Sequence, residues 1–199
     1  MKIIILAIGG GANNVFDSVI ATGIEGCELI LVNTDADALF ERELTGHFKR
    51  LLIGQTLTWG LGSGADPDVG KKSAEVDINH FKIILKGANL VIIVASMGGG
   101  TGSGASSVIA RLTRKLGVRT IAVISMPYGF EGYKCNNIAK QQADLLTWMV
   151  EDIYIFKYEL MLNTLGHHVT LLEAFESLNN QILDKVNNIV DYVRKGISL

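Results

Sequence analysis

The feature that most constrains this sequence is a glycine-rich segment, SMGGGTGSGA at residues 96–105, which directly follows the apolar run NLVIIVA at residues 89–95. An apolar, β-branched run that stops at clustered glycines and continues into helix-periodic sequence is typical of a strand, a tight loop and a helix. Glycines let backbone N–H groups approach a ligand closely, and the N-terminus of the next helix favours an anion. The segment therefore predicts a phosphate-binding loop.

This loop differs from a Walker A loop, in which Lys and then Ser or Thr follow the last glycine. Here Gly104 is followed by Ala105 and Ser106. We therefore expect backbone amides and the hydroxyls of Thr101 and Ser103 to hold the phosphates. A flexible linker is the alternative, but apolar residues recur at helical spacing after the loop, which favours a packed element.

Composition favours one compact domain without a basic partner. The chain has 199 residues, 48% of them hydrophobic, and a formal net charge of -2, so we expect a substantial core and no nucleic-acid partner. Cys27 and Cys135 form no CxxC motif or disulfide framework, and the four histidines have no metal-ligand spacing. No apolar run is long enough to span a bilayer. We expect a cytoplasmic protein that does not insert into membranes and has no protein-held metal.

Apolar runs that alternate with helix-periodic segments predict an α/β fold with a parallel sheet. The predicted strands are residues 2–8, 27–32, 48–53, 89–95, 118–125 and 153–156. A stripe of apolar residues at intervals of three and four predicts a long amphipathic helix over residues 171–193.

The first predicted strand ends at a second glycine segment, GGGANN at residues 9–14. A GxGxxG dinucleotide fingerprint would require glycine in place of Asn14, so a Rossmann enzyme using another nucleotide is disfavoured. Asn33, Thr34 and Asp35 follow the next strand; they either face the same crevice or cap the next helix, because both roles suit these residue types. Asp66 followed by Pro67 predicts a helix start.

Six motifs, taken in order, resemble the FtsZ family of tubulin-like cell-division GTPases. They are GGGANN at 9–14, NTD at 33–35, GLGSGADPDVG at 60–70, GGGTGSG at 98–104, PYGFEG at 127–132 and LLEAF at 171–175. The resemblance implies a Rossmann-like parallel-sheet GTPase domain over residues 1–199 that ends in a long central helix. It also implies GTP or GDP as ligand and FtsZ-type subunits as cytoskeletal partners in septation, and Mg²⁺ is expected with the phosphates.

The resemblance also assigns the residues around the nucleotide, and it assigns no catalytic residue. The first glycine segment would border the nucleotide through Gly9, Gly10, Gly11 and Asn13. The second would cradle the phosphates through Gly98, Gly99, Gly100, Thr101, Gly102, Ser103 and Gly104. Glu131 would contact the ribose, Phe175 would stack on the guanine base, and Asn179 would hydrogen-bond its edge.

Three departures from the family pattern shape the expected activity. The family usually has Arg three residues after the glycine of FEG, where this chain has Cys135 beside Lys134. Its Asn-Asp pair is replaced by Tyr158-Glu159. The sequence stops at Leu199, before the family's acidic loop and second domain, so we expect GTP binding, little hydrolysis alone, and pairing with or capping of complete subunits. The alternative is a nucleotide-free regulatory or structural relative.

Overall fold

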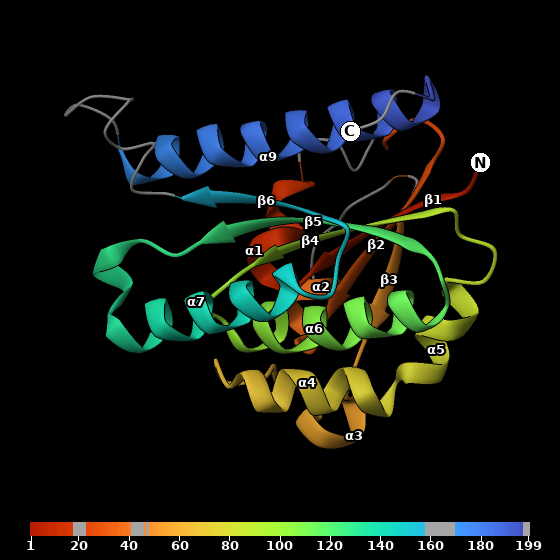
Figure 1. The fold of residues 1–199 in the computed structure, drawn as a ribbon. Helices are drawn as coiled ribbons and strands as arrows, with labels where there is room; N and C mark the ends of the chain where they lie inside the picture. The colour runs from red at the N-terminus through yellow and green to blue at the C-terminus, as the bar shows by residue number, and fades with distance from the viewer. Residues whose placement is uncertain (18–22, 41–45, 47, 158–169, 197–199) are drawn as a thin grey trace.

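A computed structural model describes residues 1–17, 23–40, 46, 48–157 and 170–196 of the chain. Within them, six strands form one sheet in the order β3-β2-β1-β4-β5-β6 (Figure 1). All five neighbouring pairs are parallel, which confirms the predicted α/β class. The strands are β1 (Ile3–Ile8), β2 (Cys27–Asn33), β3 (Phe48–Leu52), β4 (Leu90–Ser96), β5 (Arg119–Met126) and β6 (Asp152–Lys157).

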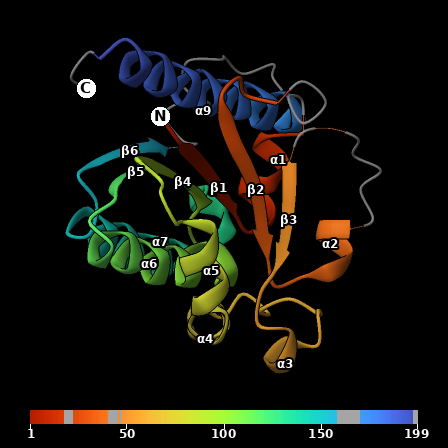
Figure 2. The same cartoon turned by 90° about the vertical axis from the view of Figure 1, so that its right-hand side faces the viewer.

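Helices cover both faces of the sheet, as Figures 1 and 2 show. One face carries α1 (Gly10–Val15), α2 (Ala36–Phe40) and the long helix α9 (Leu171–Arg194). The other carries α4 (Pro67–Val76), α5 (Ile78–Ile84), α6 (Gly100–Lys115) and α7 (Tyr133–Thr147). The short helix α3 (Gln55–Thr58) packs on α4, and a 3-10 turn, η1 (Gly129–Glu131), precedes α7. In the described ranges, no helix combines the length and apolar character that a membrane span requires.

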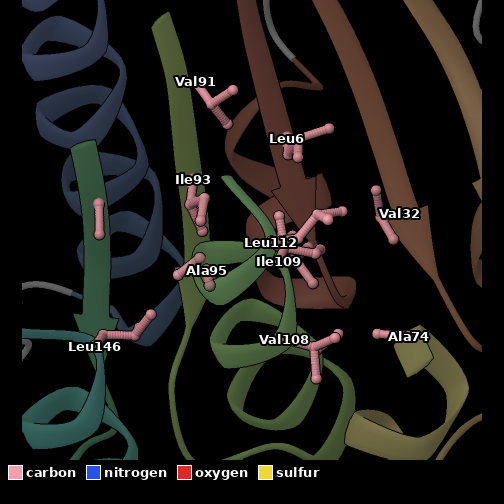
Figure 3. Close-up of a cluster of buried hydrophobic side chains, with 14 of the residues drawn as sticks. Leu6, Val32, Ala74, Val91, Ile93, Ala95, Val108, Ile109, Leu112 and Leu146 are labelled. Carbon is pink, nitrogen blue, oxygen red and sulfur yellow. The ribbon is translucent and has the colours of Figure 1, made fainter. Parts of the chain in front are cut away.

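Alternation along the central strands divides the core into two apolar clusters. In β1, Ile3 and Ile5 join the cluster under α1 and α9, whereas Ile4 and Leu6 join the cluster under α6. Figure 3 shows part of the second cluster, in which Leu6 of the sheet lies against side chains of α6. Each fully buried aliphatic side chain of this kind contributes about 1.5–3 kcal/mol. These two clusters hold the strand ends that build the site.

Helix α9 begins at a side-chain cap and has a stripe of buried apolar residues along one side. Thr170 caps it by accepting a hydrogen bond from the Glu173 backbone N–H at 3.3 Å. The Glu173 carboxylate accepts in return from the Thr170 backbone N–H and hydroxyl, and these hydrogen bonds lower the pKa of Glu173. The observed helix, Leu171–Arg194, confirms the helix predicted over residues 171–193. Its buried stripe includes Leu178, Ile182 and Val186.

Helix α4 begins as the Asp66-Pro67 pair predicts, because the Asp66 carboxylate accepts a hydrogen bond from the Asp68 backbone N–H at 2.8 Å. Replacing Asp66 with alanine should lower the free energy of unfolding by about 1 kcal/mol, measured by urea denaturation. Asp66→Asn keeps a capping oxygen and should stay within about 0.5 kcal/mol of the parent. Equal losses in the two variants would contradict the capping role.

Candidate functional site

The order of the strands in the sheet indicates where a ligand-binding site is expected. β1 and β4 are neighbours, and the chain proceeds outward from them in opposite directions, to β2 and β3 on one side and to β5 and β6 on the other. Open α/β sheets bind ligands beyond the carboxyl ends of the strands at such a reversal point. In Figure 1 the arrowheads of β5 and β6 point to the side of the molecule where α7 and α9 begin.

A cavity of about 570 Å³ lies at this place. Residues from both glycine segments, from the turn before α4, and from η1 and the first part of α7 form its wall. The lining residues are Gly9, Gly10, Gly11, Ser63, Ala65, Ser96, Met97, Gly98, Gly99, Gly100, Thr101, Gly102, Glu131, Lys134, Cys135 and Ile138. Nine of the fourteen site residues assigned from the sequence line this cavity; Asn13, Ser103, Gly104, Phe175 and Asn179 do not.

The second glycine segment is less of a loop than the sequence predicts, because α6 already begins at Gly100. Only residues 97–99 connect β4 to α6. Gly98 has φ +100° and donates its backbone N–H to the Ser103 hydroxyl at 2.9 Å, which fixes the turn. The first N–H groups of a helix have no acceptor within it, so the turn and the start of α6 present backbone donors and a partial positive charge to the cavity.

Close packing explains the glycines inside α6. A Cβ on Gly102 would lie 2.5 Å from the Ser96 carbonyl oxygen, and a Cβ on Gly104 would overlap the Pro67 carbonyl oxygen. Gly102 therefore lets α6 approach the end of β4, whereas Gly104 lets it approach α4. Ser103 is fully buried, and neither it nor Gly104 lines the cavity. These two residues shape the turn between β4 and α6 from behind the cavity wall.

The first glycine segment contacts the second directly. Gly9 has φ +83°, and a Cβ there would lie 2.9 Å from the Gly102 backbone nitrogen. A Cβ on Gly11 would overlap the side chain of Ser96. Gly9, Gly10 and Gly11 all line the cavity. The absence of side chains at two of these positions is what allows the two segments to form one continuous wall.

A buried polar network supports this wall. Asn13 is fully buried; its side chain donates to the Ala7 carbonyl oxygen at 2.8 Å and accepts from the Asn33 side chain at 3.2 Å. The Asn33 side-chain oxygen accepts from the Thr34 backbone N–H at 2.9 Å. The hydroxyls of Thr34 and Thr101 share a hydrogen bond of 2.7 Å. The network links β1 and β2 to the first turn of α6, beneath the cavity.

This network shows where the polar residues that follow the first two strands lie. Asn13 lies behind the cavity wall and does not line it. Asn33 and Thr34 are likewise buried in the network and do not line the crevice. Asp35 takes the alternative role of a helix cap, since its carboxylate accepts from the Ala38 backbone N–H at 2.9 Å at the start of α2.

Glu131 lies on the cavity wall with its carboxylate already engaged. One oxygen accepts from the Tyr128 backbone N–H at 2.7 Å, and the other is 3.8 Å from the Cys135 sulfur. Partial burial and the Glu131 charge raise the pKa of the Cys135 thiol, so this side chain stays neutral at physiological pH. The same two causes raise the pKa of Tyr128.

The residues predicted to contact the base are not among those that line this cavity. Phe175 and Asn179 are on α9 and do not line it. The Phe175 ring meets the Tyr128 ring edge-on, with centroids 5.4 Å apart, so the start of α9 packs beside the PYGFEG segment. Tyr158 and Glu159, and also His167 and His168, lie outside the described residues.

Several lining residues were not named individually from the sequence: Ser63, Ala65, Ser96, Met97, Lys134, Cys135 and Ile138. Ser96 and Met97 nevertheless belong to the segment predicted to bind phosphate. A usable signal existed for Ser63 and Ala65, because both lie in the glycine-rich turn before the capped helix α4. Ile138 gave none, since an apolar residue in an amphipathic helix is ordinarily a core residue. Within the described ranges, no three His, Cys, Asp or Glu side chains cluster closely enough to hold a metal ion.

An open parallel sheet with glycine segments and a helix N-terminus at its reversal point is typical of nucleotide-binding α/β domains. Residues 2–166 match the GTPase domain of the Tubulin/FtsZ family. The chain belongs to this family, which confirms the resemblance seen in the sequence.

Relatives and solved structures agree with this assignment. The chain is 40% identical over 191 residues to the cell division protein FtsZ of Wigglesworthia glossinidia brevipalpis. The aligned region covers 96% of this chain and 49% of the relative. It is 37% identical over 194 residues to FtsZ of Coxiella burnetii, with 98% and 50% covered. The chain thus spans about half the length of these curated relatives.

Among solved structures, an empty FtsZ dimer from M. jannaschii superposes with a TM-score of 0.87 at 29% identity, covering 96% of this chain and 54% of that chain. CetZ2 from Haloferax volcanii, a GTPγS-bound protofilament, superposes with a TM-score of 0.79 at 19% identity, covering 96% and 59%. The second likeness concerns the fold alone. Both superpositions show that this chain has the same arrangement of sheet and helices as the matching part of these solved structures.

Proposed function

We propose that residues 1–199 form the GTP-binding domain of an FtsZ-type cell-division protein. The observation that carries this proposal is the cavity of about 570 Å³ at the reversal point, whose wall combines both glycine segments with the start of α6. Its volume is within the range of small-molecule sites. Backbone donors and a helix N-terminus are suited to phosphates, and the family membership favours a guanine nucleotide.

The proposed roles combine the positions of the lining residues with the roles that the family resemblance implies. The backbone of Gly98, Gly99 and Gly100 and the first turn of α6 hold the phosphates, and the first glycine segment continues the same wall. Glu131 faces the ribose. Phe175 and Asn179 contact the base, and Asn179 has no hydrogen bond to any described residue, so its amide is available. Mg²⁺ accompanies the phosphates and is held chiefly by phosphate oxygens and water.

We also propose that this chain binds GTP without sustained turnover. A hydrolytic site needs a group that orients or deprotonates the attacking water. Glu131 is the single carboxylate among the lining residues, and both of its oxygens already have partners. A second FtsZ-type subunit is the proposed source of the missing group, and the chain is proposed to assemble with, or cap, such subunits.

Calorimetric titration of the purified chain with GTP in the presence of Mg²⁺ should give saturable binding, whereas ATP should give a much weaker signal or none. The reason is that the cavity and α9 offer a phosphate cradle and a base-contacting amide for guanine. A phosphate-release assay on the same sample should show little turnover. Equal binding of ATP would contradict guanine selectivity, and sustained turnover would contradict the proposed lack of a water-orienting group.

The absence of any saturable nucleotide signal would instead favour the nucleotide-free regulatory role. Sedimentation with a full-length FtsZ supplies the complementary measurement. Co-pelleting of this chain, or shortening of the polymers, is the result expected from pairing or capping. Unchanged polymers and no co-pelleting would contradict the proposed partner.

A further inference from the structure

The charges around the cavity are few. Of its lining residues, Glu131 and Lys134 are the charged ones, and formally they cancel. The carboxylate of Glu131 is occupied by the Tyr128 backbone N–H and the Cys135 thiol. A nucleotide triphosphate brings several negative charges to this wall, and backbone N–H groups neutralise only part of them.

Lys134 differs from Glu131 in having no committed partner. Its side chain is exposed, and within the described residues it takes part in no hydrogen bond or ion pair. It lies in the first turn of α7, on the wall that faces the phosphate-holding turn. A long, flexible ammonium with free donors at the rim of an anion site is suited to move onto a phosphate oxygen.

The neighbouring residue has no positive charge to offer. The Cys135 sulfur packs against the turn at Gly98, so closely that a Cβ on Gly98 would lie 2.5 Å from it. The thiol is neutral and faces the Glu131 carboxylate. Cys135 therefore fills this part of the wall, and Lys134 is the cation next to it.

Resting on the proposed function, we propose that Lys134 is the phosphate-contacting cation of this cavity and sets how strongly the site prefers phosphorylated over unphosphorylated nucleoside. Its ammonium forms a charge-assisted hydrogen bond to a phosphate oxygen, and the backbone donors of the turn provide the remaining contacts. Lys134 does not contact the nucleoside part of the ligand, so it does not contribute to the binding of an unphosphorylated nucleoside.

The test compares Lys134→Gln with the parent by titration with GTP and with guanosine, at low and high salt. GTP affinity should fall about tenfold, the size of one charge-assisted hydrogen bond, and guanosine affinity should not change. The salt dependence of GTP binding should become shallower, because one cation no longer contributes. Lys134→Arg should bind GTP within about threefold of the parent, since Arg is also a phosphate-binding cation.

Lys140→Gln is the matched control, because Lys140 is exposed on the same helix and does not line the cavity. It should bind GTP like the parent. Parent-like GTP binding by Lys134→Gln, or an equal loss for GTP and guanosine, would overturn the role of Lys134 and leave the proposed function intact. Failure of the parent chain to bind GTP would overturn both. Thermal melting should show the same stability for all variants, since the Lys134 ammonium has no partner among the described residues.

Discussion

Gly104→Ala should destabilise the protein by about 3 kcal/mol, because the packing of α6 against α4 leaves no space for the added methyl group. Its Cβ would overlap the Pro67 carbonyl oxygen and lie 2.5 Å from the Lys71 backbone nitrogen. Both atoms belong to the backbone of α4, so relief requires moving one helix away from the other. Overpacking of this kind typically costs 1–3 kcal/mol, and rigid backbone on the far side favours the upper end of that range. Urea unfolding monitored by circular dichroism measures the loss.

Gly99→Ala is the matched control in the same segment. A Cβ on Gly99 would meet no atom within 4 Å, and its backbone has φ -82°, which any residue adopts. The cost should be below about 1 kcal/mol, mostly from the weaker helix cap. If Gly104→Ala proved as stable as Gly99→Ala, close packing would not be the reason for glycine at position 104.

Asn13→Ala should lower the free energy of unfolding by about 2–3 kcal/mol and weaken nucleotide binding as well. The substitution removes the acceptor of the Asn33 side-chain amide and the donor to the Ala7 carbonyl oxygen. Both groups are deep in the protein, and a buried polar group left without a partner costs about 1–3 kcal/mol. Because Asn33 also positions Thr34, which contacts Thr101, the effect extends to the start of α6.

Chemical denaturation and GTP titration of the same Asn13→Ala sample provide the two readouts. Asn180→Ala is the control, because Asn180 is exposed on α9; it should change stability by less than about 0.5 kcal/mol. Loss of stability with unchanged GTP affinity would show that the network supports the fold and has no influence on the site. An effect no larger than that of Asn180→Ala would contradict the network's importance altogether.

The sheet could be predicted from sequence because strands buried on both faces are continuous apolar runs. β1 and β4 are such runs, and each ends at glycines that no buried strand would continue through. The parallel α/β class followed from the alternation with helical segments. The capped starts of α4 and α9 could also be recognised, because capping uses side chains within three residues of one another.

The helical state of residues 100–104 could not be predicted, because glycine is among the poorest helix formers. What makes these residues helical is the backbone of α4 and the ends of β1 and β4, which α6 approaches through Gly102 and Gly104. The buried position of Asn13 has the same kind of cause. Its partners, Ala7 and Asn33, lie on neighbouring strands, and sequence spacing does not reveal which polar side chain will turn inward.

The set of residues that line the cavity was harder still to predict, because only the tertiary structure brings these residues together. Ser63, Ile138 and Met97 come from three separate parts of the chain and meet only at the reversal point. No local pattern distinguishes Ile138 from a core residue of α7. The glycine segments, by contrast, carried enough local chemistry to predict that they line a site, since closely spaced glycines after a buried strand allow close approach of a ligand.

The direct contact between the two glycine segments has a consequence for how the chain acquires its site. Gly9 and Gly102 belong to distant parts of the sequence, yet the missing side chain of Gly9 is what lets the backbone of Gly102 lie against it. We therefore expect the pocket to form only after the central strand pair, β1 and β4, has come together. A nucleotide that binds only the completed pocket acts as a folding ligand: at one hundred times its dissociation constant it would add about 2.7 kcal/mol to the stability of the whole domain.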